Sequence, residues 1–159
     1  MGQTQERRTG TQDMADKLVA ERQEMWVAYC RLAGLEPYHE ERPTAEMVRE
    51  FCQVLVDYIA AGHFSLYARI VEGKERRQAV VHLAEEIYLP LSNTTDVAVA
   101  FNDKYEGYAN DEYCEEIARD LSQIGESVAT RIDLEDRLLQ AMLAPRGVHS
   151  GAEEPSPVI

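Results

Sequence analysis

Apolar residues recur at intervals of three and four along nearly all of residues 12–143, and this periodicity most constrains the fold. Such spacing puts one apolar face along a helix, and no stretch of useful length alternates in the way that predicts a strand. In residues 12–32 one such face carries Met14, Leu18, Met25, Tyr29 and Leu32. Few long helices with short links bury their faces as an antiparallel bundle. We therefore expect an all-α, four-helix-bundle-like fold.

The pattern sets approximate bounds for the helices. They are predicted over residues 12–32, 45–61, 75–108 and 111–143, and the second continues in helical register from 63 to 72. Gly34 is a plausible end for the first helix, and Thr44 and Asn110 are suitable N-caps for the second and the last. Pro90 either kinks or splits the third. The long helices and the interrupted middle one define the expected architecture.

The two ends of the chain differ from the middle. Residues 1–12 are polar and predict a flexible N-terminal lead-in. Residues 145–159 are rich in Pro, Gly and Ser without periodicity, which predicts a disordered tail. The helical domain is accordingly expected to span residues 13–144.

Acidic residues dominate the charge. There are 29 Asp and Glu against 16 Lys and Arg, a formal net charge of −13. A protein that binds nucleic acid through its backbone needs Lys and Arg to replace counterions, so direct nucleic-acid binding is not expected. The charge favours a basic partner or serves solubility alone.

Other classes also find no support. No apolar run approaches the ~20 residues of a membrane helix, and no secretory signal is visible at the N-terminus. The cysteines, Cys30, Cys52 and Cys114, share no C-x-x-C spacing and are expected to act as small buried hydrophobes. These features predict a reduced, cytoplasmic protein that does not associate with membranes.

The second helix carries acids on the face opposite its apolar arc. Glu46, Glu50, Gln53 and Asp57 follow one another at i, i+4, i+7 and i+11. Two interpretations stay open for these residues. They form a solvated face, or they form a docking edge for Lys or Arg of a partner, where charge steers association and sets register.

A possible break follows the acids. Gly62 is a C-cap, a kink or a close packing point, and it precedes His63 and Phe64. Either Phe64 packs inside a capped helix end, or the break exposes an aromatic side chain. In the last helix, Arg131 and Glu135 fall at i and i+4 along the edge of the apolar stripe and are spaced to form an ion pair.

No constellation predicts catalysis or a metal. A di-iron bundle needs two Glu-x-x-His pairs and two further acids, whereas the one match, Glu36-Pro37-Tyr38-His39, contains a proline that places it in a loop. A phosphate-binding glycine loop, a Gly-x-Ser-x-Gly and a His-Glu-x-x-His are all missing from the sequence. We expect no enzyme, cofactor or metal. A small-molecule or metal-binding bundle and an adaptor for another enzyme remain the alternatives.

Residues 51–64, Phe-Cys-Gln-Val-Leu-Val-Asp-Tyr-Ile-Ala-Ala-Gly-His-Phe, closely resemble the Rsd/AlgQ family. These proteins are bacterial regulators of sigma D, anti-sigma factors for the housekeeping sigma subunit of RNA polymerase. Further similar segments lie at residues 27–34, 100–103, 121–126 and 134–138. The resemblance thus covers about residues 14–143 in order.

The resemblance implies a four-helix-bundle-like protein without catalysis or a required cofactor. It implies binding to the C-terminal, promoter −35-reading domain of the housekeeping sigma factor, with Asp57 in the contact and Tyr58 beside it. The family often has Ser two residues after the Tyr, where this chain has Ala60.

The residue pattern and the resemblance together suggest a contact surface. We expect Asp57 and Glu50 to meet Arg or Lys of sigma, while Tyr58, His63 and Phe64 supply contact area. Occupying this domain would keep sigma from both promoter and core polymerase. The free protein is expected to be a monomer.

Overall fold

The computed structural model describes residues 2–35, 45–71, 77–109 and 115–144 and consists of helices. Its long helices are α1 (Gly2–Ala33), α2 (Ala45–Gly62), α4 (Gln78–Tyr105) and α5 (Glu115–Leu143). A π-helical turn, η1 (His63–Tyr67), and the short α3 (Ala68–Val71) extend α2. No strand occurs within the described ranges, which confirms the predicted all-α class.

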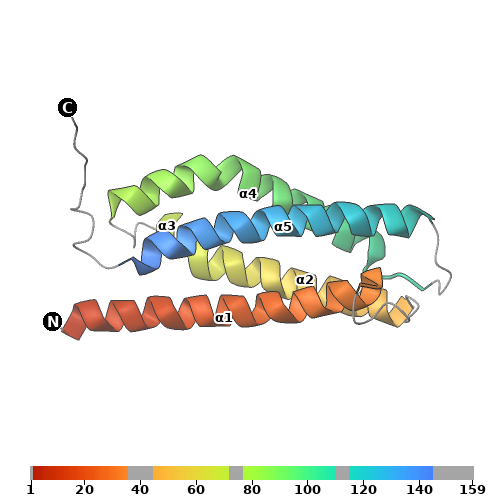
Figure 1. Cartoon of the computed structure of the whole chain (residues 1–159), viewed down its shortest axis with the longest axis horizontal. Coiled ribbons are helices and arrows are strands. Elements are labelled where there is room, and N and C mark those ends of the chain that lie inside the picture. The colour runs from red at the N-terminus through yellow and green to blue at the C-terminus, as the bar shows by residue number, and fades with distance from the viewer. Residues whose placement is uncertain (1, 36–44, 72–76, 110–114, 145–159) are drawn as a thin grey trace, which may run out of the picture.

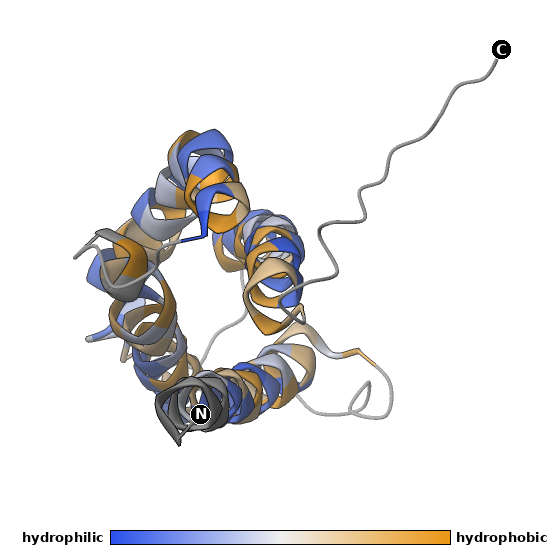
Figure 2. Cartoon of the chain, turned by 90° about the vertical axis from the view of Figure 1, so that its left-hand side faces the viewer, coloured by the Kyte–Doolittle hydropathy of each residue, from blue (hydrophilic) through white to orange (hydrophobic). Residues whose placement is uncertain are grey.

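Each long helix runs antiparallel to its neighbours (Figure 1). Helix α2 packs between α1 and α4, and α5 packs between the same two helices from the other side. Seen from the end, the helices form a ring around the bundle axis (Figure 2). Helices α2 and α5 therefore lie diagonally across the bundle and meet through side chains in its centre.

Helix α1 ends where the sequence predicts. Gly34 has a φ of +70°, a conformation that only glycine adopts without steric cost. The backbone N–H of Leu35 then donates to the carbonyl of Cys30 at 2.9 Å, and that of Gly34 donates to Arg31 at 3.3 Å. Both bonds satisfy carbonyls that the helix end would leave open.

The start of α1 differs from the prediction. The helix begins at Gly2, so residues 2–12 are helical where the sequence predicted a flexible lead-in. Gln, Glu and Arg, which favour helix intrinsically, make up most of residues 3–8. Residues 2–12 lack the regularly spaced apolar residues by which an amphipathic helix is recognised in a sequence. The expected tail at 145–159 and the expected caps Thr44 and Asn110 lie outside the described residues.

Pro90 bends α4 without splitting it. The helix is continuous from Gln78 to Tyr105, and its curve is visible in Figure 1. Pro90 and its neighbours Tyr88 and Leu89 are exposed. Because the interrupted hydrogen bond lies on the outer side, the helix curves around the core. Of the two predicted outcomes, the kink is the one observed.

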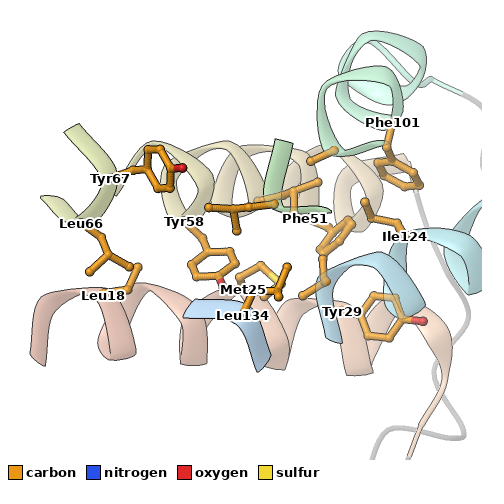
Figure 3. Close-up of a cluster of buried hydrophobic side chains, with 14 of the residues drawn as sticks. Leu18, Met25, Tyr29, Phe51, Tyr58, Leu66, Tyr67, Phe101, Ile124 and Leu134 are labelled. Carbon is orange, nitrogen blue, oxygen red and sulfur yellow. The ribbon is translucent and has the colours of Figure 1, made fainter. Parts of the chain in front are cut away.

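Aromatic and aliphatic side chains from every long helix meet in one core (Figure 3). Tyr29 of α1 lies 5.8 Å from the ring of Phe51 on α2, which lies 5.5 Å from Phe101 on α4. Trp26 stacks on Tyr29 at 5.1 Å and packs, partly buried, against this core. This aromatic row joins three helices at one end of the bundle.

Cys52 behaves as the small buried hydrophobe that the sequence predicts. It is 1% exposed, and burial together with nearby Glu106 raises the pKa of its thiol to about 12. Cys30 is only partly buried, and Cys114 lies outside the described residues. A thiol with so high a pKa is a poor nucleophile at neutral pH.

Gly125 of α5 provides a test of this packing. A Cβ at this position would lie 2.0 Å from the Tyr29 hydroxyl, which donates to the carbonyl of Leu121 at 2.9 Å. We expect Gly125→Ala to displace Tyr29 and to lower the free energy of unfolding by about 1–3 kcal/mol in urea titrations. In α1, Gly10 has no atom within 4 Å of such a Cβ. Gly10→Ala should instead be neutral or stabilise by about 0.5–1 kcal/mol. Equal unfolding energies for both variants would contradict the packing.

Candidate functional site

The acids predicted on the second helix form one exposed row on α2. Glu46, Glu50, Gln53 and Asp57, here called the acidic stripe, all lie on its outer face. The Gln53 side-chain amide donates to Asp57 Oδ1 at 3.2 Å. Within the described part of the chain, no Lys or Arg forms an ion pair with the three acids of the stripe. Their charge is therefore available to a partner.

An apolar groove runs beside the acidic stripe, between α2–η1 and α4. Its volume is about 400 Å³. It is lined by Leu55, Val56, Ile59, Ala60, His63, Phe64, Thr95, Ala98, Val99 and Asn102. Three of these apolar side chains are strongly exposed: Val56 at 42%, Val99 at 51% and Phe64 at 72%. Exposed apolar side chains gathered in one groove, rather than scattered singly, indicate an interaction surface.

The turn η1 presents Phe64 to this groove. The backbone N–H of Ala68 donates to the carbonyl of His63, five residues earlier, so the turn holds one more residue than an α-helical turn. Leu66 and Tyr67 point inward, while His63 and Phe64 are exposed with their rings 5.0 Å apart. Of the two interpretations of Phe64, the exposed aromatic is the one observed.

Tyr58 does not lie on this surface. It is 0% exposed and points from α2 into the core near Met25 and Leu134 (Figure 3). The expectation that Tyr58 supplies contact area to a partner is therefore wrong. One residue along a helix turns the side chain by about 100°, so Tyr58 faces the core while Asp57 faces solvent.

A buried polar network surrounds Tyr58. Its hydroxyl donates to the carboxylate of Glu135 on α5, which also accepts from Arg22 Nη2 of α1 at 3.2 Å and from Arg131 Nε at 3.0 Å. Burial and the adjacent Glu135 carboxylate raise the pKa of Tyr58, so it stays the protonated donor. Arg22 also donates to Asp136 at 2.8 Å.

Arg131 carries the network to α4. Its Nη1 donates to the hydroxyls of Thr94 and Thr95 at 3.2 and 2.7 Å. The predicted pairing of Arg131 with Glu135 is confirmed, but its predicted place at the edge of the stripe is wrong. The two residues are 2% and 1% exposed and lie in the centre of the bundle. A buried pair of this kind needs its remaining donors and acceptors satisfied, and the threonines and Tyr58 do so.

Gly62 connects the network to the surface segment. It keeps right-handed helical φ and ψ, so the helix does not end there. A Cβ on Gly62 would lie 2.7 Å from Glu135 Oε2 and 3.4 Å from Arg131 Nη2. Of the three roles predicted for Gly62, the close packing point is the one observed. The network therefore lies directly behind the segment that runs from Asp57 to Phe64.

A second polar cluster joins α4 to α5 on another side. Lys104 contacts Asp120 at 2.7 Å and Glu116 at 2.5 Å, and the Tyr105 hydroxyl donates to Asp120 at 2.5 Å. The pKa of Asp120 is lowered because these hydrogen bonds outweigh its partial burial. Every carboxylate here is paired, in contrast to the acidic stripe.

The described residues offer little for other kinds of site. No group of three or more His, Cys, Asp or Glu side chains among them is placed to hold a metal ion. The di-iron match at 36–39 lies outside the described residues. None of the described helices combines the length and apolar character that crossing a membrane requires.

An all-α bundle with an acidic stripe beside an exposed apolar groove has a surface of the kind that marks protein interaction sites. The comparison with known families identifies it further. The chain belongs to the family described as regulator of RNA polymerase sigma(70) subunit, Rsd/AlgQ, whose model matches residues 1–143.

Several relatives of the chain share the name "Regulator of sigma D". The chain is 35% identical over 135 residues to "Regulator of sigma D" of Yersinia pseudotuberculosis serotype O:1b, covering 82% of this chain and 80% of that one. It is 34% identical over 154 residues to "Regulator of sigma D" of Salmonella arizonae, covering 96% and 94%. No solved structure matches the chain.

The buried network predicts a large effect at Glu135. We expect Glu135→Ala to lower the free energy of unfolding by about 3–5 kcal/mol, because Arg131 would be left buried without its counter-charge. Asp133→Ala, an exposed acid on the same helix, should change it by less than about 0.5 kcal/mol. Chemical denaturation of both variants measures the difference. Replacing the pair together, as Arg131→Met with Glu135→Leu, should recover only part of the loss, because the buried Tyr58 hydroxyl and Arg22 would still lack their acceptor. A Glu135→Ala variant as stable as Asp133→Ala would contradict the role of the network.

Proposed function

We propose that this member of the Rsd/AlgQ family is an anti-sigma factor. It binds the C-terminal, −35-reading domain of the housekeeping sigma factor. The observation that carries the proposal is the unpaired acidic stripe beside the apolar groove. Membership of the Rsd/AlgQ family and relatives named "Regulator of sigma D" support it. Such a surface offers both charge and apolar area to a single partner.

Charge complementarity supports this choice of partner domain. A −35-reading domain is a helix-turn-helix module, and its DNA-facing surface is basic because it meets phosphates. In the proposed complex, Asp57 and Glu50 meet Arg or Lys of that surface. The net charge of −13 on the full chain attracts the basic domain as the two proteins approach. This attraction acts over ~8–10 Å in physiological salt.

Charge alone is too weak to hold the complex. Ion pairs between exposed side chains contribute about 0–1 kcal/mol each. Burying an exposed Phe contributes about 1.5–3 kcal/mol, and Phe64 is 72% exposed in the free protein. We therefore assign the anchoring role to Phe64, with His63 adding contact area beside it. The acids then set orientation and the rate of association.

The proposed mechanism is occlusion. A sigma domain whose basic surface is covered by the acidic stripe cannot present that surface to −35 promoter DNA, and the bundle sterically blocks its approach to core polymerase. The protein would carry out no reaction and need no cofactor. It would act as a monomer in the cytoplasm, without direct contact with nucleic acid or membrane.

Asp57→Arg tests the proposal. Reversing the charge would put Arg against a basic partner, and like charges across an interface cost several kcal/mol. We expect purified housekeeping sigma, immobilised in a pull-down, to retain the wild type and to lose Asp57→Arg.

Asp133→Arg is the matched control, because it makes the same charge change at an exposed site on α5, diagonal to α2. It should be retained like the wild type. Retention of Asp57→Arg at the wild-type level would remove Asp57 from the interface. A wild type that sigma does not retain would contradict the proposed function.

A further inference from the structure

The apolar groove has a second bank on α4, which the acidic stripe does not touch. Thr95, Ala98, Val99 and Asn102 line this bank, and Val99 is 51% exposed. Across the groove stand Val56 and Phe64, at 42% and 72% exposed. Apolar area is therefore offered from two helices at once.

Acids border the groove on both sides. On α2, Asp57 follows Val56 directly. On α4, the exposed Asp103 lies four residues after Val99, which puts both on one side of the helix. Asp96 faces away from the groove, because it lines the pocket between α4 and α5 with Lys104 and Asp120. Lys104 of α4 is turned away, in contact with Asp120 and Glu116 of α5. The lining of the groove itself holds no Lys, Arg, Asp or Glu.

Both polar side chains of the α4 bank already make hydrogen bonds. Thr95 accepts from Arg131 at 2.7 Å, and the Asn102 amide donates to Glu106 at 3.1 Å. A small-molecule site fixes its ligand with a few free polar groups among apolar ones. This groove instead offers apolar contact inside and charge outside, which is what an amphipathic helix recognises.

We propose that the groove takes a large apolar side chain from an amphipathic helix of the partner, whose flanking basic residues meet Asp57 on one bank and Asp103 on the other. The proposal rests on the proposed function, with the helix supplied by the C-terminal domain of sigma. A second copy of this chain is disfavoured as occupant, because two chains of −13 would bring acidic banks together. Val99 is then a specificity-determining residue on a helix outside the acidic stripe.

Val99→Asn and Val19→Asn form a matched pair of variants. Val19 lies on α1, outside the groove, and is 45% exposed. Val and Asn have similar helix propensities, so neither change should disturb the fold, which urea titration checks. Titration calorimetry with the purified C-terminal domain of sigma gives the dissociation constants.

We expect Val99→Asn to weaken binding about tenfold or more, and Val19→Asn to leave it unchanged. The slope of log Kd against log salt should stay at the wild-type value for Val99→Asn, because no charge is lost. Asp103→Asn should reduce that slope.

The outcomes separate this proposal from the proposed function. Equal affinities for Val99→Asn and Val19→Asn, while Asp57→Arg abolishes binding, would overturn the groove as a docking site and leave the proposed function standing. A wild type that does not bind the sigma domain would overturn both. Sedimentation of the free protein adds one more outcome. A wild-type dimer that Val99→Asn converts to monomer would identify a second copy as the occupant and overturn the proposal.

Discussion

The carboxylate of Glu135 is the interaction on which the rest of the bundle depends. It is 1% exposed and accepts hydrogen bonds from Arg22 of α1, Tyr58 of α2 and Arg131 of its own helix. Arg131 extends the same network to the threonines of α4. Apolar packing alone tolerates small shifts between helices, whereas a buried charge is strongly destabilising once a partner is lost. The network therefore sets the register of all the long helices relative to one another.

This constraint reaches the surface through a short segment of α2 and η1. Tyr58 is held from inside, and Gly62 leaves room for no side chain against Glu135. Asp57, just before Tyr58, and Phe64, just after Gly62, point outward. The wider π-helical turn lets Leu66 and Tyr67 return to the core directly after the exposed His63 and Phe64. A charged and an aromatic group are thus held on one face by a rigid support.

Local signals in the sequence predict most of the fold. The periodicity predicts the helices, Gly34 predicts the end of α1, and the spacing of Arg131 and Glu135 predicts their pairing. The long-range part is not predictable in this way. Nothing local indicates that Arg22 and Tyr58 converge on Glu135 from helices more than 70 residues away in the chain. The burial of Tyr58 is a different case, because the helical period already places it on the apolar face, seven residues after Phe51. Its expected contact role comes from the resemblance, which marks a segment and not the direction of each side chain.

The apolar groove likewise has one part that local sequence signals indicate and one part that depends on long-range packing. The sequence offers an exposed aromatic as one of two interpretations of Phe64, whereas the α4 bank around Val99 depends on how two helices pack. Its one local signal is a valine with an aspartate four residues later, Val99 and Asp103, on one side of a helix.

In the proposed mechanism, this protein competes with promoter DNA for one surface of sigma. Fluorescence anisotropy of a labelled −35 promoter duplex, bound to the purified C-terminal domain of sigma, tests it most directly. Adding the protein should return the anisotropy to that of free DNA, with a midpoint that rises with salt. An anisotropy that rises instead would mean that protein, sigma domain and DNA bind together, and it would contradict the proposed competition.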